Sequence, residues 1–270
     1  MTQIALTIAG SDSGGGAGVQ ADLRTFALHC IHGASAITCV TAQNTVGVTQ
    51  VQAMDAAVVR SQIEAVGTDF KINSLKTGML LNRDIIEVVA QQIQKFAFKQ
   101  LVVDPVMVSR TGVQLIDDDA IASIQNLLLP QALIITPNLY ESQILSGLTI
   151  NTIEDLKQAA VIIQESFGST VVLAKGGGLS GNDRGRDVWY DGTEIRTLSE
   201  KVIKTKNTHG TGCTLSAAIC ANLALGKDLW SAVVAAKKYV TNALEHSLDI
   251  GAGNGPIGHF FPLLTLNSQA

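Results

Sequence analysis

The chain has 270 residues and a formal net charge of −4, and 46% of its residues are apolar against 16% that are charged. These proportions predict a compact protein with a large buried core. A small negative net charge gives no electrostatic reason to expect binding to nucleic acid or to an anionic membrane surface. No run of 18 apolar residues appears, so we predict no membrane-spanning helix. The first 16 residues lack the basic segment of a signal peptide and are interpreted as a first strand and its turn.

Four cysteines are present, and four are too few for a disulfide framework in a chain of this length. We therefore expect a reducing, cytoplasmic location. The five histidines are scattered along the chain, so we predict no structural zinc site. The cysteines are Cys30, Cys39, Cys213 and Cys220.

Short apolar runs alternate with helical patterns along most of the chain. Strands are predicted at 4–9, 34–40, 72–79, 100–106, 132–138 and 170–178. Helices are predicted at about 17–31, 58–66, 84–96, 117–128, 161–167, 211–225 and 228–246. Because the strands are apolar on both faces, this alternation predicts a mostly parallel central sheet covered by helices on both faces.

The alternation breaks once, at residues 187–198. There an Asp-Gly pair separates two runs with strand-like composition, which is a hairpin signal. We therefore expect antiparallel strands late in the chain. No internal repeat, low-complexity tract or linker is apparent, so we predict one domain, 1–270.

Polar residues and glycines follow several of the predicted strands. They come after positions 9, 40, 76, 103, 135 and 174. In doubly wound sheets, ligands bind beyond the carboxyl ends of the strands, so this pattern predicts an active site along that edge.

The first such segment is AGSDSGGGAGVQAD (9–22). A glycine-rich turn between strand and helix lets backbone N–H groups approach a ligand, with Asp12 and Asp22 as candidate polar contacts. The alternative is an ordinary tight turn. A dinucleotide-binding fingerprint fits weakly, because no acidic residue follows at the distance that a ribose would need.

Two more segments carry hydrogen-bonding groups. VTAQNTVGV (40–48) contains Gln43 and Asn44, whose carboxamides offer both a donor and an acceptor, as the edge of an aminopyrimidine ring does. A polar loop is the alternative. In VVDPVM (102–107), Asp104 ends a buried strand, where an aspartate can reach Mg²⁺ or phosphate or can simply be a solvated turn residue.

In TPNLYE (136–141), Asn138 and Glu141 stand three residues apart on one helical face and could hold Mg²⁺ through water. The alternative is a capping box, in which each side chain binds the other residue's backbone N–H. In LAKGGG (173–178), Lys175 could reach a phosphate or could be a plain loop lysine.

The last segment is THGTGCTLS (208–216). Gly210 and Gly212 precede a helix whose free N–H groups and dipole favour an anion. Cys213 lies in the first turn, where we expect a lowered thiol pKa and a nucleophilic or basic role. The alternative is a packed apolar cysteine.

Taken in order, these stretches resemble the hydroxymethylpyrimidine/phosphomethylpyrimidine kinase family of thiamine biosynthesis, a branch of the ribokinase-like superfamily. The resemblance extends to GAGNGPIGHF (251–260) and so spans nearly the whole chain. It implies a ribokinase-like three-layer α/β sandwich of roughly eight strands, the cofactors ATP and Mg²⁺, a small pyrimidine substrate, and commonly a homodimer. The motifs are AGSDSGGGAGVQAD, TAQNT, KTGML, VVDPVM, ITPNLYE, KGG and HGTGCTLSAA.

The same resemblance implies roles for individual residues. Gln43 would bind the pyrimidine, Met79 and Val106 would line its pocket, and Asp22 would be a further substrate contact. Asn138 and Glu141 would hold Mg²⁺. Lys175, Thr208 and Asp104 would lie near the ATP phosphates. Gly210 and Gly212 would form an anion hole, and Cys213 would take the place of the aspartate base of sugar kinases.

Two motifs depart from the family pattern. Ser13 and Gly14 replace Pro-Ser, which we expect to loosen the first loop, and Gly178 stands where a histidine is common. Three other functions remain open: pyridoxine/pyridoxal kinase, a binding protein without turnover, and a nucleotide-dependent dehydrogenase.

Overall fold

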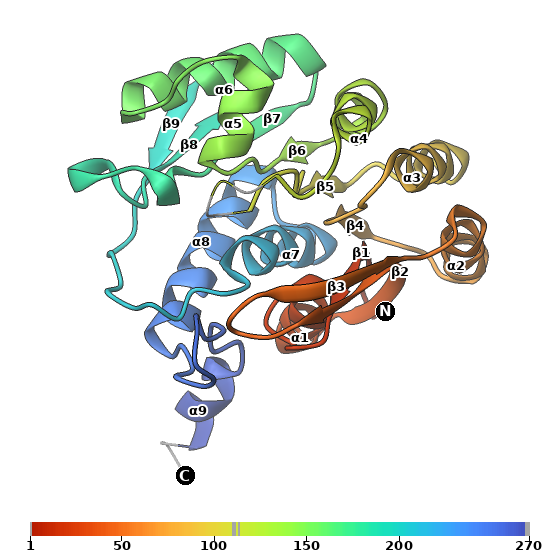
Figure 1. Cartoon of the computed structure of the whole chain (residues 1–270), viewed down its shortest axis with the longest axis horizontal. Coiled ribbons are helices and arrows are strands. Elements are labelled where there is room, and N and C mark those ends of the chain that lie inside the picture. Colours follow the sequence, from red (N-terminus) through yellow and green to blue (C-terminus); the bar gives the residue numbers. More distant parts are fainter. Residues whose placement is uncertain (1, 110–111, 113, 268–270) are drawn as a thin grey trace.

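A single sheet runs through the part of the chain that the structure, a computed structural model, describes: residues 2–109, 112 and 114–267. It has nine strands there, in the order β3-β2-β1-β4-β5-β6-β7-β8-β9 (Figure 1). The strands are β1 (Ile4–Asp12), β2 (His32–Gln43), β3 (Val48–Ala53), β4 (Ser74–Thr77), β5 (Leu101–Val103), β6 (Ile134–Ile135), β7 (Val171–Ala174), β8 (Asp187–Tyr190) and β9 (Ile195–Leu198).

Strand directions confirm the predicted mostly parallel sheet. β1 pairs in parallel with β2 and with β4, and the parallel pairing continues through β5, β6 and β7. β8 and β9 are antiparallel, as the Asp-Gly hairpin signal predicted. Asp191 closes that hairpin, because one of its carboxylate oxygens accepts the backbone N–H groups of Thr193 and Glu194.

Alternating side chains of the strands divide the core into two layers, because successive residues of a strand point to opposite faces. Leu101 and Val103 face one layer and Val102 faces the other, and Ile134 and Ile135 divide in the same way. The layer that contains Leu101 also holds buried side chains of α2, α3, α4 and α6, and the layer that contains Val102 holds those of α1, α7 and α8.

The helices therefore cover both faces of the sheet, which gives the three layers visible in Figure 1. The segment predicted as one helix at 117–128 is α4 followed by a π-helical turn (Ile124–Leu128) and a 3₁₀ turn (Leu129–Gln131). The helices are α1 (Gly18–Leu28), α2 (Ala56–Asp69), α3 (Arg83–Lys95), α4 (Asp118–Ser123), α5 (Leu139–Ser146), α6 (Ile153–Phe167), α7 (Thr211–Ala224), α8 (Leu229–Glu245) and α9 (Phe261–Asn267).

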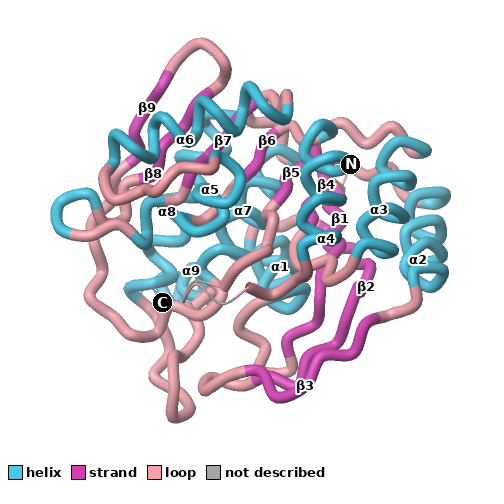
Figure 2. The backbone as a smooth tube through the Cα atoms, turned by 45° about the horizontal axis from the view of Figure 1, so that its top comes forward, coloured by secondary structure: helices cyan, strands magenta, loops and turns pink. Residues whose placement is uncertain are grey.

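An antiparallel strand at the other edge of the sheet was not predicted. β3 pairs with the end of β2, and the two strands form an arm that extends away from the helices (Figure 2). The polar alternation of VTQVQA lacks the apolar run of a buried strand, because this arm lies outside the core and most of β3 is exposed. The segment read as a loop after residue 40 is therefore a hairpin, and Gln43 is the last residue of β2.

No helix within the described residues is both long enough and apolar enough to cross a membrane.

Candidate active site

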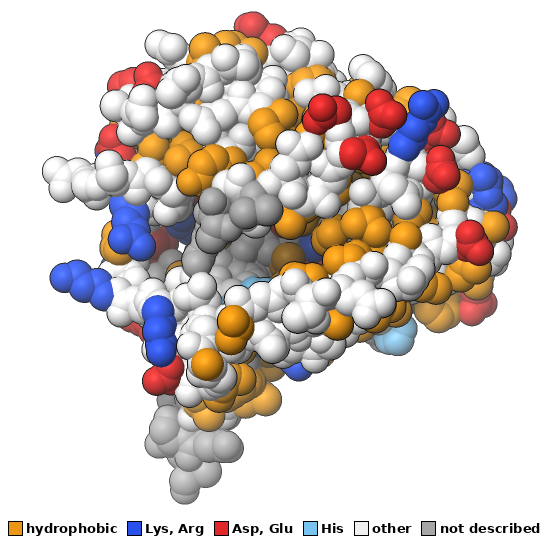
Figure 3. All heavy atoms as spheres, viewed as in Figure 1, with side chains coloured by type: hydrophobic (Ala, Val, Ile, Leu, Met, Phe, Trp, Pro, Cys, Tyr) orange, Lys and Arg blue, Asp and Glu red, His pale blue; other side chains and the backbone are white. Residues whose placement is uncertain are grey.

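The carboxyl ends of β5 and β7 meet the first turn of α7 at one place in the fold. A methyl group added to Gly212 would lie 3.5 Å from Lys175 Nζ and 3.9 Å from Asp104 Oδ2. One turn further along α7, the hydroxyl of Ser216 donates to Asp104 Oδ2 at 3.1 Å. Side chains predicted to act together from three distant motifs are therefore neighbours. The face of the molecule seen in Figure 3 is hollowed beside the β2–β3 arm.

Asp104 and Lys175 form a nearly buried ion pair, with 3.0 Å between Oδ1 and Nζ. Burial opposes the charge of Lys175, but the carboxylates of Asp104 and Glu141 raise its pKa above the ordinary value. Burial raises the pKa of Glu141 from 4.5 to about 7, against the lowering effect of Lys175. One ammonium group thus interacts electrostatically with two buried carboxyl groups, an arrangement that favours a further cation.

Asn138 and Glu141 form the capping box that was the alternative to a metal pair. Asn138 Oδ1 accepts the N–H of Glu141, and Glu141 Oε2 accepts the N–H of Asn138. Glu141 Oε1 also accepts the N–H of Met107, and Asn138 Nδ2 donates to the carbonyl of Val108. Both side chains therefore orient the backbone at the start of α5, and Asn138 in turn orients Glu141.

The first turn of α7 begins at a glycine that no other residue could replace without strain. Gly210 is the N-cap with φ of +83°, and a Cβ there would lie 1.8 Å from the carbonyl oxygen of Gly16. Within the described part of the chain, no side chain caps this turn. The first-turn N–H groups of a helix have no intrahelical partner, so they remain available to an anion. Thr208 begins the turn, and its carbonyl accepts the Thr211 hydroxyl at 2.6 Å.

The pKa of Cys213 contradicts the expected lowering at a helix N-terminus. Burial raises the thiol pKa from 9.0 to about 11. Lys76 and the backbone N–H of Gly18 lower it, but Asp22 and Asp104 raise it further. The prediction failed because it counted the helix dipole and missed both the loss of water around sulfur and the two nearby carboxylates.

Asp22 was predicted to contact the substrate, but its side chain has no exposed surface. Lys76 Nζ donates to both of its carboxylate oxygens, at 3.0 and 2.8 Å, and the hydroxyl of Thr7 donates to Oδ2 at 2.6 Å. Burial alone would lower the pKa of Lys76, yet Asp22 above all holds it higher than usual. The Lys76–Asp22 ion pair is therefore buried and acts electrostatically on Cys213. The side chain of Asp22 cannot contact a substrate directly, because it has no exposed surface.

Sequence reasoning missed Lys76, which lies inside the buried strand β4. It also missed His209, whose ring Nε2 lies 2.8 Å from Asp12 Oδ2 and 3.4 Å from Gln43 Nε2. The signal for His209 was its place immediately before the Gly-Thr-Gly turn, whereas its two partners are close only in the folded chain.

Val106 and Met79 are both partly exposed, as lining residues of a pocket must be. Val106 has φ of +44°, a left-handed conformation that is rare for a β-branched residue. Such strain costs on the order of 1–3 kcal/mol and is typical of functional sites, where surrounding structure holds it in place. This feature adds structural support to Val106, which the sequence indicated only through the resemblance.

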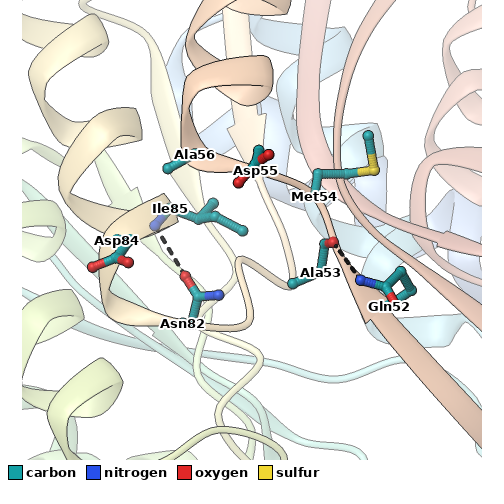
Figure 4. Close-up of a pocket in the computed structure, with 8 residues that line it drawn as sticks. All are labelled: Gln52, Ala53, Met54, Asp55, Ala56, Asn82, Asp84 and Ile85. Carbon is teal, nitrogen blue, oxygen red and sulfur yellow. Dashed lines mark hydrogen bonds between the residues drawn. The ribbon is translucent and has the colours of Figure 1, made fainter.

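A separate pocket of about 360 Å³ lies between the end of β3 and the start of α3 (Figure 4). Its wall includes the exposed or partly exposed carboxylates of Asp55 and Asp84, and Asn82 caps α3 by accepting the N–H of Ile85. None of its lining residues is among the predicted site residues, so the pocket is distinct from the site around Cys213.

The Asp22–Lys76 pair generates a stability prediction. Asp22→Asn or Lys76→Met alone should lower the free energy of unfolding by about 3–5 kcal/mol, because each leaves a buried charge unpaired. The double variant should regain at least half of the summed loss, since neither charge then remains. Urea unfolding followed by tryptophan fluorescence measures this, and simple additivity of the two losses would show that the side chains do not interact.

Known proteins are similar to this chain over most of its length. The family model described as phosphomethylpyrimidine kinase matches residues 12–258. A hydroxymethylpyrimidine/phosphomethylpyrimidine kinase of Synechococcus elongatus is 57% identical over 260 residues, covering 96% of this chain and 98% of that protein.

Two solved structures are similar over most of the chain. The ADP complex of Bacillus subtilis pyridoxal kinase has a TM-score of 0.90 at 37% identity, covering 98% of this chain and all of that one. A phosphomethylpyrimidine kinase from Clostridium difficile has a TM-score of 0.81 at 39% identity, covering 90% of this chain and all of that one. With its family model matched from β1 to the segment before α9, the chain belongs to the phosphomethylpyrimidine kinase family.

Proposed function

We propose that this protein transfers the γ-phosphoryl group of ATP to the hydroxymethyl group of 4-amino-5-hydroxymethyl-2-methylpyrimidine, and then to the resulting monophosphate. The observation that carries the proposal is the meeting of the uncapped first turn of α7 with Lys175 and Asp104. Phosphoryl transfer needs little covalent help from a protein, and its catalysis rests on positioning and charge stabilisation. The family membership makes an aminopyrimidine alcohol the acceptor.

The phosphate groups would bind between the α7 turn and Lys175. Backbone N–H groups at Gly210, Gly212 and Cys213 point the positive end of the helix toward developing charge on the transferred group. Lys175 adds a full positive charge on the opposite side, and Thr208 lies where the turn begins. The wall residues Met79 and Val106 would hold the pyrimidine ring, with Gln43 at its polar edge.

Magnesium fits the chemistry of the two carboxyl groups beside Lys175. Glu141 and Asp104 offer anionic oxygens, and Mg²⁺ usually takes one or two carboxylates, with water and phosphate oxygens completing its shell. No cluster of three or more metal-ligating side chains occurs among the residues that the structure describes. Bound Mg²⁺ would neutralise charge on the phosphates. Asn138 would contribute by holding Glu141 in place.

Cys213 would act in the first transfer only. The hydroxymethyl group must lose a proton, and Cys213 as thiolate would accept it. The phosphate oxygen that accepts the second phosphoryl group is already anionic, so that step needs no base. With a pKa of about 11, the thiol is ionised in roughly one molecule in ten thousand at neutral pH, which makes the thiolate scarce but strongly basic.

A pyridoxal kinase activity is the second candidate, because the structure is so similar to the Bacillus subtilis pyridoxal kinase. Both acceptors are flat rings with a hydroxymethyl group. The family match and the 57% identity to a pyrimidine kinase favour the pyrimidine as the main substrate.

We also propose that the protein works as one domain, as a homodimer and in the cytoplasm. The β2–β3 arm offers an apolar surface for a second copy, since Val46, Val48 and Val51 are each more than two fifths exposed. All four cysteines are free thiols, which suits a reducing compartment.

The function is tested by ATP consumption with the pyrimidine alcohol, its monophosphate and pyridoxal measured in parallel. We expect turnover with both pyrimidines, one ADP formed per phosphoryl group transferred, and kcat/KM for pyridoxal at least tenfold lower. Turnover with pyridoxal alone would reassign the protein, and binding of the pyrimidine without ADP formation would leave a binding protein.

Cys213→Ser should slow the first transfer on the order of a hundredfold, the usual size of a general-base effect, and the second transfer much less. Because the raised thiol pKa lies far above neutrality, kcat/KM of the wild-type first transfer should rise about tenfold per pH unit between about pH 8 and 9.5. Single-turnover kinetics at several pH values measure both effects.

Cys220→Ser is the matched control, because Cys220 is a buried thiol of the same helix that contacts Ser74. It should slow the two transfers equally. A pH-independent first transfer, or equal losses in Cys213→Ser, would make Cys213 a packing residue.

Millimolar Mg²⁺ should raise Tm by about 2–4 °C at pH 8 and by much less at pH 5.5, a stabilisation near 1 kcal/mol. Burial raises the pKa of the Glu141 carboxyl group from 4.5 to about 7. The folded protein therefore binds this proton more tightly than the unfolded chain does, and the stability that the proton contributes is lost as pH rises from 4.5 to 7. A cation needs the ionised carboxylate, so binding should strengthen across the same range.

The Mg²⁺ effect is measured by differential scanning calorimetry without nucleotide. Glu141→Gln should abolish it, whereas Glu165→Gln, at an exposed position of α6, should retain it. A Mg²⁺ effect that persists in Glu141→Gln would place the cation elsewhere.

A further inference from the structure

The carboxamide of Gln43 lies between two side chains that dictate which way it turns. Thr41 Oγ1 is 3.2 Å from Gln43 Oε1, and His209 Nε2 is 3.4 Å from Gln43 Nε2. The backbone of Gln43 is held independently, because the hydroxyl of Ser13 donates to its carbonyl and accepts its N–H. Ser13, which departs from the family pattern, therefore ties the first loop to β2 and holds the backbone of Gln43 in place.

His209 Nε2 must carry a hydrogen. Its partner at 2.8 Å is Asp12 Oδ2, which also accepts the N–H groups of Gly16 and Ala17. Burial works to raise the pKa of Asp12, but the hydrogen bonds from His209 and the backbone hold it below the ordinary value. The carboxylate is thus ionised and can only accept, so Nε2 donates. With the amide nitrogen of Gln43 beside it, two donors would face each other.

At Thr41 the same orientation of the carboxamide would bring two acceptors together. Its hydroxyl has one hydrogen, and the shorter contact, 2.9 Å to the carbonyl of Ser11, takes it. Only lone pairs of Oγ1 are then left for Gln43, so an amide oxygen at 3.2 Å would place two acceptors together.

Turning the carboxamide by 180° about its last bond corrects both contacts at once. The amide nitrogen then donates to Thr41 Oγ1, and the amide oxygen accepts a longer branch of the His209 Nε2 hydrogen, which is shared with Asp12. One amide hydrogen and one oxygen lone pair remain for a ligand. The free acceptor lies on the His209 side, and the free donor lies on the Thr41 side.

This order matches the edge of the proposed substrate. Along that ring the hydroxymethyl group, the amino group and a ring nitrogen follow one another. Along the protein the anion-binding turn at 210–213 is followed by the acceptor beside His209 and then by the donor beside Thr41. The amino group would meet the acceptor and the ring nitrogen would meet the donor while the hydroxymethyl group points to the turn.

We propose that Thr41 and His209 are positioning residues that lock the Gln43 carboxamide in this orientation, and that the lock selects a ring with an amino group beside the hydroxymethyl group. The proposal rests on the proposed function for its substrate class. A ring without that amino donor leaves the amide oxygen with its second lone pair unused, which costs affinity when the site is closed to water.

The test compares the pyrimidine alcohol with 5-hydroxymethyl-2-methylpyrimidine, which has hydrogen in place of the amino group. Discrimination is the ratio of the two kcat/KM values. Thr41→Val should lower it about tenfold, the effect of one oriented hydrogen bond, because the carboxamide can then turn. Thr41→Ser keeps the hydroxyl and should retain the wild-type ratio within about twofold.

His209 provides an independent pair of variants. His209→Leu removes the donor and should lower discrimination, whereas His209→Gln can keep a donor near Asp12 and should restore most of it. KM for ATP should change little in the Thr41 variants. Equal discrimination in Thr41→Val and Thr41→Ser, or in His209→Leu and His209→Gln, would overturn the lock.

Calorimetric binding of the two compounds to each variant separates this inference from the proposed function. If the wild type does not phosphorylate the pyrimidine alcohol, the proposed function fails, and the ratio of dissociation constants still decides whether Thr41 and His209 orient Gln43. If the wild type does phosphorylate it and neither ratio responds to the variants, only the lock fails.

Discussion

The carboxylate of Asp12 holds the two ends of the site together. It accepts the backbone N–H groups of Gly14, Gly16 and Ala17 and the ring N–H of His209, a residue nearly two hundred positions later in the chain. A buried carboxylate with this many donors is stable as an anion, and it brings the first glycine loop against the turn that opens α7. The same contact fixes the His209 ring beside the carboxamide of Gln43.

Close packing of glycines makes that contact possible. A Cβ at Gly16 would lie 2.3 Å from the His209 ring, and one at Gly210 would overlap the carbonyl of Gly16. Glycine is needed on both sides of this contact, because the His209 ring occupies the space that a side chain at position 16 would need, and the backbone of Gly16 occupies the space that a side chain at position 210 would need. The first and last motifs therefore form one interface between two loops.

The buried charged side chains beneath the site are positive and negative in turn. Lys76 is paired with Asp22 and Lys175 with Asp104, and Glu141 is a third carboxyl group, which raises the pKa of Lys175 together with Asp104. These groups lie at the ends of strands and at the starts of helices, where a parallel sheet brings distant segments to one edge. Burial is the largest cause of the raised thiol pKa of Cys213, and the carboxylates of Asp22 and Asp104 add to it.

Local chemistry in the sequence was enough to predict much of this protein. Apolar runs followed by glycine or proline identify the parallel strands, and the Asp-Gly pair identifies the late hairpin, because such patterns act through neighbouring residues. The ordered motifs likewise indicated Asp104, Lys175 and Gly210. The strand β3 was missed because its exposed side chains carry no apolar signal, and it exists through pairing with β2.

The sequence by itself determined the parallel strands, the late hairpin and the chemical types of the groups at the carboxyl edge of the sheet. Only the tertiary structure decided which of those groups contact one another. It buried Asp22 against Lys76, raised the thiol pKa of Cys213 and placed His209 beside Gln43. Burial and partner choice depend on residues far apart in the chain, and no local pattern records them.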